Sequence, residues 1–136
     1  MENIKISQIF QYINNKDYKK VKEILNIFDP NLCDENFNNT ILHQACENYD
    51  LKMVKIIIKC GAHVSILNKK YETCLDIAIK NIIDGDHELI KYLIQNGSKV
   101  DYLQKKYLIK YIKLLLSKYP ENYQHLKDDL LFFKKI

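Results

Sequence analysis

The sequence lacks arginine altogether, so all 21 of its basic residues are lysine. Arginine recognises phosphate groups and guanine through paired hydrogen bonds, and its absence disfavours nucleic acid as a partner. Only 3 glycines and 2 prolines are present, which favours a helical protein with few tight turns. No apolar stretch approaches the length that spans a membrane, and the N-terminal segment does not resemble a signal peptide.

The composition is typical of a soluble globular protein. The 136 residues fit one domain, with 47% hydrophobic and 28% charged residues. Cys33, Cys46, Cys60 and Cys74 are expected to be free thiols, because the chain shows no secretion signal. We therefore expect an intracellular, cytoplasmic protein, located in the host cytoplasm if a pathogen encodes it.

One segment of the sequence occurs twice. TILHQACENYDLKMVKIIIKCGA (40–62) returns as TCLDIAIKNIIDGDHELIKYLIQNGS (73–98), with three additional residues within NIIDGDHE. The offset is 33 before these residues and 36 after them, a period typical of stacked helical repeats. Equivalent residues are Thr40 and Thr73, Leu42 and Leu75, Ala45 and Ala78, Val54 and Ile90, Ile57 and Leu93, and Gly61 and Gly97.

Each copy predicts two short helices. The threonine before each first helix can cap its N-terminus, and Leu42 and Ala45 fall on one helical face. A second helix begins near Leu51 and carries an apolar stripe with spacings of three and four residues. It ends at Gly61, where the chain needs a residue that adopts a positive φ angle. Alanine at Ala45 and Ala78 would let neighbouring helices approach closely.

These motifs resemble those of the ankyrin repeat family. TILHQA and TCLDIA are similar to the family signature T-P-L-H-x-A, and IIIKCGAHVSI and YLIQNGSKVDY to the end of its second helix. The resemblance implies an all-α solenoid of stacked helix-turn-helix pairs with short hairpin-like loops. Departures from the pattern are Ile41 and Cys74 in place of proline, Asp76 in place of the histidine kept as His43, and Tyr49 in place of the glycine between the helices.

The two ends of the chain resemble diverged copies. The N-terminal segment predicts two helices around residues 14–17, and Val21 stands 33 residues before Val54. The C-terminal segment predicts a helix, a break at Pro120 and a last helix. Its end, DDLLFFKKI, either covers the stack, which is favoured, or binds a partner. We therefore predict one domain over 1–136, with repeats near 3–35, 36–68, 69–104 and 105–136, and helix pairs near 3–28, 36–60, 73–96 and 105–136.

The resemblance implies a protein that binds another protein and catalyses no reaction. Ankyrin arrays usually bind through their concave face and loop tips, and a rigid array keeps the ordering cost of binding low. The sequence has no glycine-rich phosphate loop and suggests no nucleophile–base pair, so we expect neither an enzyme nor a cofactor. The family's variable positions correspond to Asn36, Phe37, Asn39, Glu47, Asn48, Lys69, Lys70, Glu72, Lys80, Asn81, Lys105 and Lys106.

Some of these positions have a second interpretation. Phe37 is either an exposed anchor for a partner or a side chain that folds back into space left by the missing loop glycine. The lysine pairs 69–70 and 105–106 are predicted to lie on adjacent loop tips, as a basic edge or a solvated surface.

Two alternative functions remain open. The first is electrostatic binding of nucleic acid or anionic surfaces through the C-terminal lysines. Residues 69–136 contain 13 lysines and 9 acidic residues, whereas residues 1–68 contain 8 lysines and 8 acidic residues, so the positive charge lies in the C-terminal half. The second is self-assembly, although a monomer is favoured. No membrane interaction is expected.

A zinc site is a further possibility that the spacing disfavours. His43, Cys46, Cys60 and His63 have suitable side chains. His43 and Cys46 are predicted on a helix and His63 on the outgoing loop, so the four are not expected to converge. We expect His43 to form a structural hydrogen bond near Thr40, and Cys46 to fill a small buried position.

Overall fold

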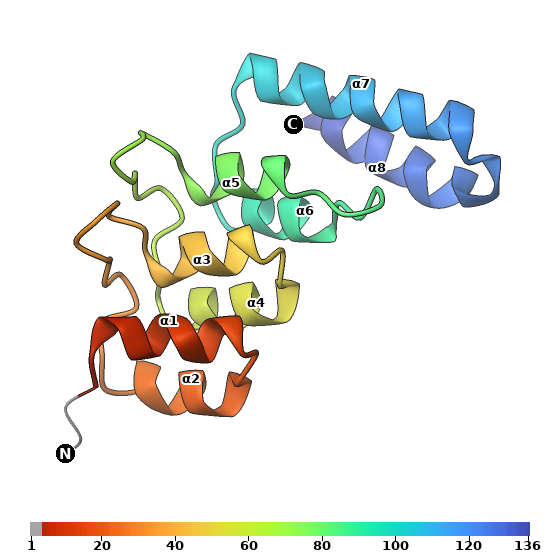
Figure 1. Cartoon of the computed structure of the whole chain (residues 1–136). Coiled ribbons are helices and arrows are strands. Elements are labelled where there is room, and N and C mark those ends of the chain that lie inside the picture. Colours follow the sequence, from red (N-terminus) through yellow and green to blue (C-terminus); the bar gives the residue numbers. More distant parts are fainter. Residues whose placement is uncertain (1–3) are drawn as a thin grey trace.

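The computed structural model of the chain describes residues 4–136, apart from the side chain of Asn122 (Figure 1). This part contains eight α-helices, arranged as four successive helical hairpins. Its only β contact is an isolated bridge between Cys33 and Thr40. The elements are α1 (Ile6–Asn14), α2 (Tyr18–Leu25), α3 (Ile41–Glu47), α4 (Leu51–Lys59), α5 (Cys74–Lys80), α6 (Glu88–Gln95), α7 (Tyr102–Lys118), the 3-10 helix η1 (Pro120–Asn122) and α8 (Tyr123–Lys135).

The first three hairpins stack side by side in two layers. α1, α3 and α5 contact one another in order and form the inner layer, while α2, α4 and α6 form the outer layer. Two loops extend from the same side of the stack (Figure 1). We call residues 33–40 the first loop and residues 66–73 the second loop. The predicted all-α stack of helix-turn-helix pairs is confirmed.

Equivalent positions of successive hairpins form a continuous core. Val21, Val54 and Ile90 come from α2, α4 and α6, and all are fully buried. Ala45 on α3 and Ala78 on α5 are also fully buried. Because α3 lies between α1 and α5, a methyl side chain at these positions lets the inner helices pack closely.

Gly61 and Gly97 occupy equivalent places in adjoining hairpins, as predicted. Each follows the second helix of its hairpin, with φ angles of 100° and 105°. The next amide donates to the carbonyl five residues earlier, at 3.3 Å after Gly61 and 3.0 Å after Gly97. Both helices therefore end in the same Schellman motif.

Tyr49 turns the chain where the family has glycine. Its φ angle is 50°, and the equivalent Lys16 of the first hairpin has 58°. Left-handed backbone costs a residue with a side chain roughly 1–2 kcal/mol. The Tyr49 side chain offsets part of this cost, because its hydroxyl donates a hydrogen bond to the Asp86 carbonyl in the next hairpin.

The helix caps also connect each hairpin to the next. The Thr40 amide donates to His43 Nδ1 at 3.0 Å, so Nε2 carries the proton and donates to the Glu72 carbonyl at 3.0 Å. Asp76 replaces the histidine in the same role: its Oδ2 accepts from the Thr73 amide at 2.8 Å. The structural hydrogen bond predicted for His43 is confirmed.

The three additional residues of the third hairpin form a loop that contacts the last hairpin. Asp84 and Gly85 in this loop have positive φ angles of 47° and 73°. Gly85 is buried, and a Cβ atom there would lie 2.9 Å from Leu115 Cδ1 and 3.8 Å from Leu126 Cδ2. The loop therefore supplies part of the surface on which α7 and α8 rest.

The last hairpin begins earlier than predicted. Asp101 Oδ1 accepts from the Gln104 amide at 2.7 Å, and Gln104 Oε1 accepts from the Asp101 amide at 3.0 Å. This capping box starts α7 at Tyr102, so the helix takes up the segment expected to form a third loop tip. Lys105 and Lys106 thus lie within α7, and their predicted place on a tip adjacent to the second loop is wrong.

Of the other predicted boundaries, the start of the second pair near 36 is wrong, because residues 36–40 belong to the first loop and α3 begins at Ile41, whereas the third pair, 73–96, agrees with α5 and α6. α7 ends at Lys118, and Pro120 begins η1, where the break was predicted. The first predicted helix pair starts near residue 3, but residues 1–3 lie outside the described part. No helix among the described residues is long and apolar enough to cross a membrane.

Enlarging the alanines should destabilise the stack. We expect Ala45→Leu or Ala78→Leu to lower the free energy of unfolding by about 1–3 kcal/mol, because both sites are fully buried. Chemical denaturation would measure the change. Ser7→Leu on the exposed face of α1 is the control and should have little effect. Unchanged stability in both alanine variants would contradict the packing of α3 and α5.

Candidate functional site

A groove lies between the two loops and the inner helices α3 and α5. Its volume is about 510 Å³. The loops contribute one wall, and the exposed ends of α3 and α5 contribute the other. Among the residues that line it are seven sequence-predicted positions: Phe37, Asn39, Glu47, Lys70, Glu72, Lys80 and Asn81.

Asn68 holds the two loops together. Its side chain is buried, and Oδ1 accepts hydrogen bonds from the amides of Lys70 and Glu72 at 2.9 and 3.0 Å. Its Nδ2 donates to Asn39 Oδ1 in the first loop at 2.9 Å. Because one side chain bonds both loops, it fixes the wall of the groove in one arrangement.

The groove contains both signs of charge. Lys80 forms an ion pair with Glu72, and this hydrogen bond holds the pKa of the Glu72 carboxyl below its ordinary value. The same bond raises the pKa of Lys80. Glu47 occupies on α3 the position that Lys80 occupies on α5, and Lys70 lies on the second loop. Glu47 and Lys70 therefore leave one charge of each sign in the groove beside the Lys80–Glu72 ion pair.

Phe37 is exposed at the edge of the groove. The side chain is 55% exposed and lies outside the hydrophobic core. Its amide donates to Asp34 Oδ1 at 2.6 Å, which fixes the turn that presents the ring. The alternative in which Phe37 folds back to fill space near Tyr49 is therefore wrong.

The other five predicted positions lie outside the groove. Asn36 is exposed in the first loop, and Lys69 Nζ donates to a first-loop carbonyl at 2.9 Å. Asn48 Nδ2 donates to an asparagine of the preceding hairpin at 2.8 Å. Lys105 and Lys106 are on α7, as described above.

Four lining residues were not predicted: His43, Gln44, Asn68 and Ile77. Gln44 and Ile77 are 33 residues apart and stand one helical turn before Glu47 and Lys80. The repeat alignment could have identified both. Asn68 offered no comparable signal, because its role depends on contact with the first loop.

The four residues considered for zinc do not form a site. Both ring nitrogens of His43 are engaged in the hydrogen bonds described above, and Cys46 is fully buried, as expected. All four cysteines are free thiols. His63 is exposed in the loop after α4, where its amide donates to Asn31 Oδ1 at 2.8 Å.

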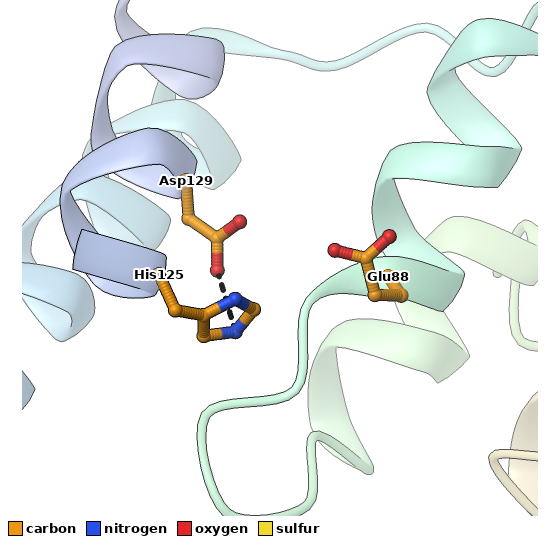
Figure 2. Close-up of side chains that lie close together, drawn as sticks. All are labelled: Glu88, His125 and Asp129. Carbon is orange, nitrogen blue, oxygen red and sulfur yellow. Dashed lines mark ion pairs between the residues drawn. The ribbon is translucent and has the colours of Figure 1, made fainter. Parts of the chain in front are cut away.

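A different cluster joins α6 to α8. Figure 2 shows Glu88, His125 and Asp129 facing one another, with potential ligand atoms within 4.8 Å. Carboxylates and imidazole can bind zinc. Here, however, the Lys91 ammonium lies between the carboxylates, 2.9 Å from Glu88 Oε1 and 2.8 Å from Asp129 Oδ1. The Lys91 ammonium therefore occupies the place where a metal ion would contact both carboxylates, and the cluster is an ion-pair network.

Asp129 is the centre of this network. It is fully buried, and its Oδ2 lies 3.0 Å from Nδ1 of the equally buried His87. Burial alone would raise the pKa of the Asp129 carboxyl, but hydrogen bonds from His87 and Lys91 outweigh it and lower the pKa. The His87 ring contacts Tyr111 and Phe133 edge-on, at centroid distances of 5.8 and 5.6 Å. The network thus attaches the last hairpin to the third.

Removing the Asp129 charge should weaken this attachment. We expect Asp129→Asn to lower the free energy of unfolding by about 2–4 kcal/mol at neutral pH, because Lys91 loses a buried partner. The pKa of the Asp129 carboxyl is lower in the folded protein than in the unfolded chain, where it is near 3.8. Its stabilising contribution is therefore fully present above pH 3.8 and is lost as the pH falls through the pKa of the folded state. Chemical denaturation at several pH values should therefore show that the free energies of unfolding of wild type and Asp129→Asn become more similar below about pH 4.

The neighbouring Asp128 provides the control for this measurement. Asp128 is exposed, and Asp128→Asn should change stability by less than about 0.5 kcal/mol. Equal effects of the two substitutions, or an Asp129→Asn effect that does not depend on pH, would contradict a stabilising buried carboxylate.

Comparison with known proteins agrees with the geometry. Residues 9–104 match the family model for ankyrin repeats, in three copies. A search of curated proteins gave no match. The matched segment spans α3 to α6 completely and includes both loops of the groove. Since this segment is more than half of the chain, the protein belongs to the ankyrin repeat family.

Proposed function

We propose that the protein binds a partner protein through the groove between its two loops and the helices α3 and α5. Ankyrin repeat domains are typically protein-interaction modules and are generally not catalytic. The observation that carries the proposal is the exposed Phe37 ring at the edge of a groove with charges of both signs. Aromatic side chains in such places often supply much of the binding energy.

The rigidity of the groove supports the same proposal. Asn68 joins the loops, and His43 Nε2 donates to the Glu72 carbonyl, so the second loop is bonded to the first loop and to α3. Little conformational entropy is lost when a partner binds a surface that is already ordered. The Glu72 carboxylate is paired with Lys80, and this pairing lowers its pKa. A carboxylate that stays charged can bind a partner's donor groups but is a poor acid or base for catalysis.

The domain organisation that we propose uses the whole chain. Three repeats lie near 3–35, 36–68 and 69–104, and the hairpin α7–α8 acts as a fourth, terminal unit that covers the stack. The support for this fourth unit is the contact of α8 with α6 through Asp129 and of α7 with α5 through Gln104 and Asp76. We also propose that the protein is located in the cytoplasm. All four of its cysteines are free thiols, which is usual for proteins inside the cell.

Truncating Phe37 should weaken partner binding. A tagged wild-type chain would first be used to purify the partner, and the affinity of the purified pair would then be measured. We expect Phe37→Ala to weaken binding at least about tenfold while leaving the melting temperature nearly unchanged, because the ring makes no core contacts.

Tyr71 offers a matched control. It is an aromatic residue of the second loop that is 82% exposed but does not line the groove. Tyr71→Ala should change the affinity by less than about twofold. If both variants bind like wild type, or both lose the same affinity, the groove is not the binding site.

A further inference from the structure

One face of α7 is uncovered in the described part of the chain. Figure 1 places α7 at the C-terminal end of the stack, with α8 packed on one side of it. A trough of about 440 Å³ runs along the exposed face, and all of its lining residues belong to α7. They are Tyr102, Lys105, Lys106, Ile109, Lys110 and Lys113.

The trough carries positive charge only. Residues 102–118 contain five lysines and no acidic residue. Lys105 Nζ donates to the Ile136 carbonyl at 2.6 Å. Lys106, Lys110 and Lys113 form no ion pair with any described carboxylate. This lysine row therefore presents three uncompensated charges on one helical face.

The floor of the trough is apolar. Ile109 lies in it half-buried, and Tyr102 at its start is 75% exposed. Lys106 Nζ lies 6.0 Å from the centre of the Tyr102 ring, so the aromatic surface and the charge are adjacent. A ligand that satisfies this surface must bring apolar groups as well as negative charge.

We propose that this face of α7 docks an acidic amphipathic helix of a partner protein. Side-chain rows on one helix form grooves into which a ridge of a second helix fits. The trough from Tyr102 to Lys113 is about 16 Å long, which corresponds to three turns. An apolar ridge of the partner covers Ile109, and its carboxylates pair with the lysine row.

Charge complementarity and the apolar floor together favour this occupant. A phosphate backbone would neutralise the lysines but leave Ile109 uncovered, and the chain has no arginine for paired phosphate contacts. The surface is separate from the groove that contains Phe37, since the two share no residue. The proposal therefore does not rest on the proposed function.

A synthetic peptide can test the docking face directly. The probe is a fluorescein-labelled helical peptide of about 18 residues, with leucine on one face and glutamate on the other. We expect fluorescence anisotropy to show saturable binding to the full chain. Lys106→Glu combined with Lys110→Glu and Lys113→Glu should weaken it at least about tenfold, and Tyr102→Ala by about threefold or more.

A triple variant elsewhere on the surface is the matched control. Lys16→Glu, Lys19→Glu and Lys99→Glu change the net charge equally at exposed positions outside the trough, and they should leave peptide affinity within about twofold. Melting curves check that each variant folds. If the Lys→Glu triple variant of α7 does not fold, Lys→Gln substitutions at the same three positions take its place.

Several outcomes would overturn the proposal. These are failure of the wild type to bind the peptide, equal losses in the two triple variants, and equal binding of a scrambled peptide that lacks an apolar face. Tighter binding of duplex DNA or of phosphatidylserine vesicles than of the peptide would assign the face to phosphate groups instead.

Discussion

Every hairpin in this protein depends on a neighbour to cover its apolar side. Val21, Val54 and Ile90 are fully buried only because successive outer helices lie against one another, and Ala45 sets how closely α3 approaches the helices beside it. Stability in such an array comes from the contacts between units as well as from each unit itself. The side-by-side position of the hairpins in turn brings the first and second loops together, and it thereby creates the groove.

Polar contacts set the relative position of neighbouring units more narrowly than apolar packing can. His43 bonds the second loop, and Asp76, its equivalent, bonds Gln104 of α7. Asn68 bonds both loops. A hydrogen bond is lost after a shift of an ångström or less, whereas apolar contacts tolerate small slides. The groove is therefore ordered by the same bonds that align the stack.

The sequence predicted the parts of the structure that repeat. Threonine caps, apolar stripes and the equivalence of Gly61 and Gly97 were all recognisable, because each reflects local backbone chemistry. Seven of the positions implied by the family resemblance line one groove, because stacking places equivalent parts of successive hairpins side by side. The start of α7 was misplaced, because the capping box of Asp101 and Gln104 replaces the repeat pattern there. The network around Asp129 could not be predicted, since its members come from separate helices and no motif connects them.

The insertion in the third hairpin lies at the junction between the first three hairpins and the last one, which is the weakest junction of the stack under force. The junction with the last hairpin consists of the loop around Gly85, the network centred on Asp129 and the hydrogen bond from Gln104 to Asp76, while α7 and α8 pack mainly on each other. Leu108 and Phe133 extend the buried core into the last hairpin, but α7 and α8 have fewer contacts with α5 and α6 than the helices of the first three hairpins have with one another. A pulling force applied between the two ends of the stack would therefore separate α7 and α8 as one intact piece, leaving the three-hairpin body and its groove in place.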